Sequence, residues 1–231
     1  MTSKAVRFIR SARSMNELMI PPVSPENSAP IDQKDRFGGI LEVPIISKLH
    51  RYTLDGFKVT GLAKILTGLQ YSSLLDVGCG IGEYSSLTHG KMYAGFDNSF
   101  PRIKFAKGMY KGKAFLQADA RQFPFKDNSF DAVLFANTAH HLSNEELTGA
   151  FRSILKVARH YVIVDDCVLS DGQGRISKFF YSLDRGTMFR HPKDFEEFFK
   201  QFPELKVKTK AFHRTFPGLY LHVVYVLEKR P

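Results

Sequence analysis

Cysteine and long apolar runs are both scarce in this chain. Its 231 residues include two cysteines, Cys79 and Cys167, which are too few for a disulfide framework or a thiolate zinc site. The apolar runs are strand-sized, such as LHVVYVL near the C-terminus, whereas a membrane-spanning helix needs roughly 18 apolar residues. These absences predict a protein without a transmembrane segment in a reducing compartment, and we expect the cytoplasm.

Three common catalytic motifs are also missing. The chain has no G-x-S-x-G nucleophile turn, no H-E-x-x-H zinc motif and no glycine-rich loop with a phosphate-binding lysine. The sequence therefore gives no reason to expect acyl-enzyme chemistry, and we expect no bound metal.

Basic residues exceed acidic ones, 33 against 23, which gives a formal net charge of +10. The excess is larger in residues 1–70 and 166–231 than in the residues between them. Basic flanks suit an acidic substrate, a nucleic acid or an anionic surface. The same charge is also typical of an ordinary solvated surface, so both interpretations stay open.

The N-terminal part differs in pattern from the rest. Residues 4–19 place apolar side chains on one helical face and three arginines on the other. This basic amphipathic helix either docks on its own domain or is an organelle transit peptide. A proline-rich arm follows over residues 21–30, and a second helical pattern runs over 45–69. We expect residues 1–69 to form a helical extension and linker on the substrate side.

From about residue 70, short apolar runs alternate with segments of helix length. The runs end in turn residues and comprise SSLLDV, MYAGFD, AFLQAD, FDAVLFA and YVIVDD. Continuous apolar strands joined by crossover helices are typical of a parallel sheet covered on both faces. Ser143 and Glu146 predict a capping box that starts one such helix, at about 144–157.

The last third follows a different pattern. Pro192 opens a helix whose phenylalanines share one face, a spacing that indicates core. Two strand-like runs around a Pro217–Gly218 turn predict a closing hairpin. We expect one domain over residues 70–231, with a substrate-side insertion at about 169–192.

A glycine-rich turn follows the first predicted strand. Asp76 ends the strand, and Gly78, Gly80 and Gly82 occupy the turn, where side chains would keep the backbone away from a nucleotide-like ligand. The nicotinamide fingerprint G-x-G-x-x-G needs a third glycine where Glu83 stands, so the turn departs from that fingerprint.

Acidic residues end the next two predicted strands. Asp97 ends MYAGFD, where a carboxylate can accept hydrogen bonds from both hydroxyls of a ribose. Asp119 ends AFLQAD, where it and the backbone of Ala120 can bind the exocyclic amine of adenine. Each acidic residue alone is also typical of a helix cap or a turn. Because the carboxyl ends of such strands meet at one edge of an open α/β sheet, we expect an adenosine-binding crevice there.

With these motifs the sequence resembles class I S-adenosylmethionine-dependent methyltransferases, most closely the small-molecule, methyltransferase type 11-like branch. The resemblance rests on LLDVGCGIG, GFDNS, QADARQFPF and DNSFDAVLFANTAHHL, and it covers roughly residues 70–168. It implies an α/β, Rossmann-like fold with a seven-stranded, mostly parallel sheet, an antiparallel last strand and helices on both faces. It also implies S-adenosylmethionine as cofactor and S-adenosylhomocysteine as product.

The resemblance further implies roles for individual residues. The glycine turn and the residue after the fourth strand would hold the methionine part of the cofactor, and the acidic strand ends would hold its ammonium group, ribose and adenine. The cofactor-binding positions implied in this way are Asp76, Gly78, Gly80, Gly82, Asp97, Asn98, Asp119, Ala120 and Asn137.

Proton removal and acceptor binding have separate candidates. His140 and His141 follow the fourth strand, and histidine suits proton removal because its ordinary pKa lies near neutrality. One of the two could instead pack under the loop and donate to a backbone carbonyl. Further along the chain, Tyr181, Arg185 and Arg190 are candidates for holding an anionic or aromatic acceptor.

The predicted function is methyl transfer to a small molecule by in-line displacement from a sulfonium. RNA methylation is the alternative favoured by the basic flanks, although ANTAHH lacks the Asn/Asp-Pro-Pro-aromatic signature of methylases that act on base amino groups. A non-catalytic, methyltransferase-like binding subunit is the third hypothesis, because a fold alone does not guarantee activity.

Overall fold

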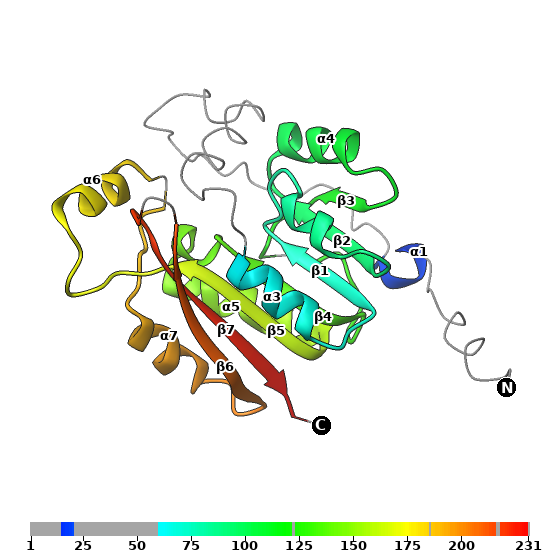
Figure 1. Ribbon diagram of the computed structural model, residues 1–231. Helices are drawn as coiled ribbons and strands as arrows, with labels where there is room; N and C mark the ends of the chain where they lie inside the picture. Colours follow the sequence, from blue (N-terminus) through cyan, green and yellow to red (C-terminus); the bar gives the residue numbers. More distant parts are fainter. Residues whose placement is uncertain (1–14, 21–59, 122, 185, 216–217, 231) are drawn as a thin grey trace, which may run out of the picture.

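A seven-stranded sheet forms the centre of the structure (Figure 1). The computed structural model describes residues 15–20, 60–121, 123–184, 186–215 and 218–230. The strands are β1 (Ser73–Val77), β2 (Met92–Asp97), β3 (Ala114–Gln117), β4 (Phe130–Ala136), β5 (Ala158–Cys167), β6 (Leu205–Arg214) and β7 (Leu221–Lys229). Their order is β3-β2-β1-β4-β5-β7-β6, and β7 runs antiparallel to both of its neighbours while the remaining pairs are parallel. The expected Rossmann-like architecture is thereby confirmed.

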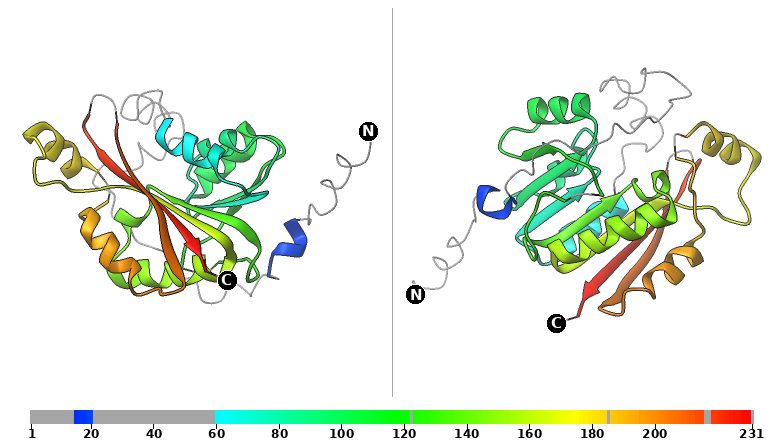
Figure 2. Two further views of the ribbon diagram at one scale, coloured as in Figure 1. Left: turned by 60° about the horizontal axis from the view of Figure 1, so that its bottom comes forward. Right: turned by 180° about the vertical axis from the view of Figure 1, so that it is seen from behind.

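Helices cover both faces of this sheet (Figure 2). On one face lie α3 (Thr60–Gly68), η3 (Glu83–Leu87) and α4 (Phe100–Met109), which share a buried apolar cluster. On the other lie α1 (Met15–Leu18), α5 (Asn144–Val157) and α7 (Pro192–Phe199). The short turn η4 (Ala139–His141) follows β4, and α6 (Arg175–Leu183) stands beyond the end of the sheet. The central strands are buried on both faces, which is why they are almost continuously apolar.

Local signals in the sequence predicted several of these elements correctly. Helix α5 begins after Ser143, whose Oγ accepts a hydrogen bond from Glu146 N at 3.2 Å, while Glu146 Oε2 accepts one from Ser143 N at 3.0 Å. This capping box is the one expected from the sequence. The closing hairpin also forms, as β6 and β7. Most of the predicted N-terminal helix over 4–19 and all of the arm over 21–30 lie outside the described residues.

The phenylalanine stripe of the last third is core. Phe198 and Phe202 pack against Phe151 of α5, with ring centroids 5.1 and 5.0 Å apart. Phe195 and Phe199 are buried beside them, at 2% and 6% exposure. Helix α7 is therefore fixed to α5 by aromatic packing, as its helical spacing predicted.

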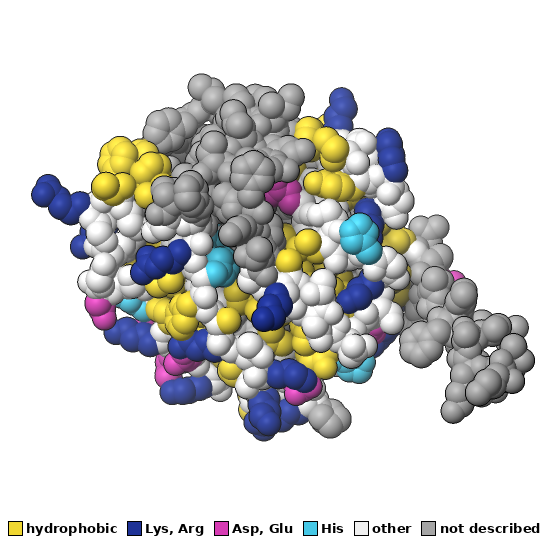
Figure 3. All heavy atoms as spheres, in the orientation of Figure 1, with side chains coloured by type: hydrophobic (Ala, Val, Ile, Leu, Met, Phe, Trp, Pro, Cys, Tyr) yellow, Lys and Arg dark blue, Asp and Glu magenta, His cyan; other side chains and the backbone are white. Residues whose placement is uncertain are grey.

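The surface seen in Figure 3 carries lysine and arginine side chains scattered over it, with no single basic patch. Apolar side chains gather over α6, where Ile176 and Phe179 are 69% and 59% exposed. Among the described residues, no helix has the length and apolar character needed to cross a membrane.

Candidate active site

The glycine turn after β1 has a backbone that side chains would disturb. Gly78, Gly80 and Gly82 all have positive φ angles, of 73°, 54° and 80°. A Cβ at Gly78 would overlap the side chain of Thr138, and one at Gly82 would come within 2.7 Å of the Phe115 ring. No described atom lies within 4 Å of the Cβ position of Gly80. The turn is thus packed at its two ends and open at its middle, where a ligand could approach the backbone.

Asp97 holds this turn in place from the tip of β2. Its Oδ2 accepts a hydrogen bond from Gly80 N, and its Oδ1 accepts one from Ser99 N, both at 2.9 Å. Its backbone oxygen accepts a bond from Ala118 N at 3.1 Å, which ties the tip of β3 to the same point. The side chain is nearly buried, at 7% exposure. Because each carboxylate oxygen can accept a further hydrogen bond, Asp97 retains acceptor capacity for ribose hydroxyls.

Asp119 is held by a neighbouring arginine after β3. Arg121 donates to it from Nε and Nη2, at 3.0 and 2.6 Å, and from its backbone N at 2.9 Å. Burial acts to raise the pKa of Asp119, but the hydrogen bonds and charge of Arg121 outweigh burial and leave the pKa below its ordinary value. Asp119 is therefore ionised at neutral pH and could accept an adenine amine beside Arg121. Ala120 lies between them, and Asn98 is exposed after β2.

Asp76 lies deeper in the sheet, at 1% exposure. Its Oδ2 accepts a hydrogen bond from the Tyr93 hydroxyl at 2.7 Å. Burial, reinforced by the charge of Asp76, raises the pKa of Tyr93, so this hydroxyl stays a donor at neutral pH. The pair fixes the carboxylate between β1 and β2, below the glycine turn. Its contact with the cofactor's ammonium group stays a prediction.

Asn137 follows β4 in a left-handed conformation, with φ of 51°. Its backbone N donates to Asp165 O at 2.8 Å, and its Nδ2 donates to the Tyr84 hydroxyl at 3.0 Å. Tyr84 belongs to η3, directly after the glycine turn, so Asn137 joins the tips of β4 and β5 to that turn. The sequence pointed to Asn137 but not to Tyr84, which shows no motif beyond an aromatic residue in a buried turn.

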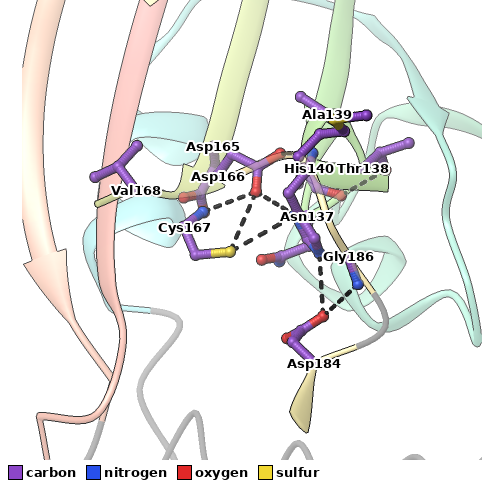
Figure 4. A network of polar contacts seen from close by, with 12 residues as sticks. Asn137, Thr138, Ala139, His140, Asp165, Asp166, Cys167, Val168, Asp184 and Gly186 are labelled. Atoms are coloured by element: carbon purple, nitrogen blue, oxygen red, sulfur yellow. Dashed lines mark hydrogen bonds and ion pairs between the residues drawn. The ribbon is translucent and has the colours of Figure 1, made fainter. Parts of the chain in front are cut away.

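His140 forms a buried pair with an aspartate that the sequence did not single out (Figure 4). Its Nδ1 lies 2.5 Å from Asp166 Oδ1, and its backbone N donates to Asp166 Oδ2 at 3.2 Å. Its Nε2 lies 3.7 Å from Asp184 Oδ1, and its ring stacks on Phe189 with centroids 5.4 Å apart. A Cβ at Gly186 would overlap the His140 ring, so the segment after α6 closes over it.

The charge state of this pair follows from its surroundings. Asp166 has no exposed surface, and burial alone would raise its pKa. The charge and hydrogen bond of His140 outweigh burial and lower the pKa of Asp166 below its ordinary value. Asp166 is therefore a carboxylate that fixes the orientation of the His140 ring. His141, in contrast, is exposed.

The guanidinium of Arg190 donates hydrogen bonds to backbone oxygens and to the side chain of Asn144. Its Nη1 donates to Ala139 O at 2.7 Å and Met188 O at 3.1 Å, and its Nη2 donates to Leu142 O at 2.8 Å. Asn144 Oδ1 accepts bonds from both Nε and Nη2, at 3.2 and 2.8 Å. These five hydrogen bonds match the five N–H groups of a guanidinium, which leaves none for an acceptor anion. Arg190 thus fixes η4, the turn that carries His140.

Two further residues, Tyr181 and Arg185, were expected to bind the acceptor. The Tyr181 hydroxyl donates to Val168 O at 2.8 Å and accepts from Leu221 N at 3.2 Å, while its ring stacks on Tyr220. Tyr181 is buried and anchors α6 to the ends of β5 and β7. Arg185 lies outside the described residues.

The comparisons with known proteins agree with this geometry. Residues 75–163 match the family model described as "Methyltransferase domain". The tRNA (carboxymethyluridine(34)-5-O)-methyltransferase of Arabidopsis thaliana is 39% identical over 74 residues, which are 32% of this chain and 18% of that protein. The fatty-acid O-methyltransferase of Mycolicibacterium smegmatis is 32% identical over 99 residues, 40% of this chain and 35% of that protein. The chain thus spans well under half the length of these relatives.

A solved structure shows the same fold at low identity. The magnesium protoporphyrin IX methyltransferase of Synechocystis PCC 6803, with bound SAH, has a TM-score of 0.60 and 16% identity, covering 82% of this chain and 96% of that chain. Together with the family match, the chain carries a class I S-adenosylmethionine-dependent methyltransferase domain. The family and cofactor class expected from the sequence are confirmed.

Proposed function

We propose that the chain is an S-adenosylmethionine-dependent methyltransferase whose acceptor is a small molecule. The observation that carries this proposal is the position of Asp97. One carboxylate holds the glycine turn through Gly80 N and stands at the strand tip where this class binds the ribose. The same turn is open at Gly80, and Asp119 is ionised at the tip of the next strand. The residues present therefore fit an adenosyl ligand.

Each part of the cofactor has residues suited to hold it. Asp97 and Asn98 would take the ribose, Asp119 and Ala120 the adenine, and the glycine turn with Asn137 the methionine part. When bound, the cofactor supplies an activated methyl group on a sulfonium. The chain must align the nucleophilic atom of the acceptor with that methyl group and exclude water, because in-line displacement depends on orientation.

We further propose His140 as the base that removes the acceptor's proton. Asp166 engages Nδ1, so Nε2 is the ring nitrogen that we assign to proton removal. Nε2 faces the segment after α6, near Asp184, and Arg190 fixes the turn on which the ring stands. A hydroxyl acceptor needs such a base, whereas a carboxylate acceptor does not.

Cofactor affinity tests the first part of this proposal. Asp97→Ala should weaken binding of S-adenosylmethionine and S-adenosylhomocysteine by about 1.5–3 kcal/mol, because a charge-assisted hydrogen bond is lost. Titration calorimetry measures this change, and circular dichroism checks that the variant folds. Asp127→Ala, at an exposed position, is the matched control. Unchanged affinity in Asp97→Ala would remove Asp97 from the site, and no binding by the wild type would favour a non-catalytic subunit.

The acceptor class needs a separate experiment. RNA is the second candidate, because five of the six matching relatives are named tRNA methyltransferases and the chain is strongly basic. Isotopically labelled cofactor would be incubated with the protein and either fractionated metabolites or total RNA. We expect label in a metabolite fraction, in a linkage that alkali does not cleave, as in a methyl ether. Label in RNA would contradict the small-molecule proposal. Alkali-labile label would indicate a methyl ester and remove the need for His140 as a base.

Two other expectations stay predictions. Cys79 and Cys167 are free, buried thiols, which is compatible with a reducing compartment such as the cytoplasm. The division into an extension over 1–69 and a domain over 70–231 rests on the sequence pattern, and α3 at 60–68 packs directly on the sheet.

A further inference from the structure

A second cluster of ionisable side chains lies at the same end of the sheet as the glycine turn. Asp165 stands near the end of β5, His213 near the end of β6 and His222 near the start of β7. His213 and His222 are directly opposite each other in the β6–β7 ladder. Asp165 is opposite Val224, two residues from His222, so all three side chains project from one face of the sheet.

The three side chains are close together and largely enclosed. Asp165 Oδ1 lies 3.1 Å from His222 Nδ1, and the rings of His213 and His222 stack with centroids 4.8 Å apart. One ligand-type atom from each residue lies within 4.8 Å of the others. Asp165 is 2% exposed and His222 is 5% exposed. Three strands therefore bring two imidazoles and one carboxylate to a single point.

We propose that Asp165, His213 and His222 form a site for a divalent transition-metal ion of the zinc type. Two imidazoles and a carboxylate are a donor set that Zn²⁺ uses, with ligand distances of about 2.0–2.2 Å. Two ligands at that distance from a tetrahedral ion lie about 3.3 Å apart. The 3.1 Å between Asp165 Oδ1 and His222 Nδ1 is already close to this spacing. Nitrogen donors disfavour Mg²⁺ and Ca²⁺, which prefer oxygen.

The described residues include a second group of possible metal ligands, His140, Asp166 and Cys167. This group fits a metal ion less well than Asp165, His213 and His222 do. His140 Nδ1 and Asp166 Oδ1 are only 2.5 Å apart, so they share a direct hydrogen bond with no room for an ion between them. The metal proposal therefore concerns the β5–β7–β6 cluster alone.

Three protein ligands leave one position of a tetrahedral ion open, as in catalytic zinc sites. An oxygen of the acceptor is the group that this position would take, because the cluster lies beside the strand tip that Asn137 contacts. That extension rests on the proposed function, whereas metal binding itself does not. The site departs from the expectation of no metal, which rested on the scarcity of cysteine and the absence of a zinc motif.

Metal binding by the full chain tests the proposal without any acceptor or cofactor. Metal-free protein would be titrated with Zn²⁺ by calorimetry and with Co²⁺ by visible spectroscopy, whose bands report tetrahedral coordination. We expect one ion per chain. His213→Ala and Asp165→Asn should each lower the affinity for the metal by at least about tenfold. Mutation of a residue that only hydrogen-bonds to a metal ligand typically lowers metal affinity by about 10–100-fold, and loss of a ligand itself should cost no less. His213 stands on the edge strand and is only partly buried, so its variant is the one best able to fold.

A control variant and three contrary outcomes complete the metal-binding test. His160→Ala removes an exposed histidine at the other end of β5 and should leave the affinity unchanged. No binding of Zn²⁺ at micromolar concentration would overturn the proposal. So would binding that His213→Ala and Asp165→Asn leave intact, or a thiolate-to-cobalt charge-transfer band that Cys167→Ser abolishes. Because none of these readouts involves methyl transfer, failure here is distinguishable from failure of the proposed function.

Discussion

Two neighbouring carboxylates at the tip of β5 face opposite sides of the sheet, and each pairs with a histidine Nδ1. Asp166 pairs with His140 at 2.5 Å and also accepts from Cys167 N at 2.8 Å. Asp165 pairs with His222 at 3.1 Å, and this is the single hydrogen bond that the described residues give its carboxylate. Among the described residues, Asp166 thus has three hydrogen bonds to nitrogen atoms, whereas Asp165 has one.

The difference shows that partner count, not residue type, separates a positioning pair from a ligand-binding pair. A carboxylate held by several hydrogen bonds keeps its partner in a fixed orientation, which is what Asp166 does for the ring of His140. Arg190 adds to this rigidity by holding the backbone of η4. A carboxylate with positions left over can bind something else, and this is the basis of the metal site proposed at Asp165.

The largest effect expected from this comparison is on stability. Asp166→Ala should lower the free energy of unfolding by about 3–5 kcal/mol, because a fully buried pair loses one partner. Asp165→Ala, measured without metal, should cost about 1–3 kcal/mol, as for a single hydrogen bond. Urea unfolding of the two variants measures both values. Equal losses of unfolding free energy would show that the two carboxylates stabilise the fold equally, and would contradict the difference proposed between them.

The next effect concerns turnover. If His140 is the base, His140→Gln should lower kcat by about 100-fold, the lower end of what a general base contributes. His141→Gln, next to it but exposed, should change kcat by no more than about twofold, which corresponds to about 0.5 kcal/mol. Initial rates with the acceptor that the labelling experiment finds measure both. Similar rates for the two variants would mean that the Asp166 pair only packs the turn.

A smaller effect is expected for the arginine that supports the turn. Arg190→Lys keeps the charge but loses the planar fork, so several carbonyls of η4 and its neighbours lose their donor. We expect a loss of about 2–3 kcal/mol in the free energy of unfolding. Arg152→Lys, on the exposed side of α5, should stay within about 0.5 kcal/mol. In a kinetic assay, Arg190→Lys should lower kcat more than it changes KM, since Arg190 has no N–H left for the acceptor.

Local patterns in the sequence were sufficient for most of the fold. The capping box at Ser143 and the phenylalanine spacing of α7 act within one or two turns of chain, and the structure confirms both. The glycine turn and Asp97 could be predicted as neighbours for a similar reason. Successive parallel strands end at the same edge of a sheet, so their last residues meet there.

The functions of side chains that meet across the fold could not be predicted in this way. Arg190 was singled out as a basic residue among aromatics, but its hydrogen bonds go to carbonyls brought near it by β4 and η4. Asp165, His213 and His222 belong to strands whose pairing depends on the antiparallel insertion of β7. Nothing in the spacing of these residues along the chain indicates that they share a face.

The smallest effect, and the sharpest test of the Asp166–His140 pair, is the dependence of stability on pH. Because the pKa of Asp166 is lowered in the folded state, its carboxylate stabilises the fold above the ordinary value of 3.8 and loses that contribution as the pH falls below it. The difference in unfolding free energy between wild type and Asp166→Asn should therefore shrink as the pH falls below about 5, by about 1.4 kcal/mol in all for each unit by which the pKa of Asp166 is lowered. Denaturant titrations across this range measure the difference. A difference that grows on acidification would mean that burial dominates and that the pKa of Asp166 is raised, in which case His140 does not hold a charged partner.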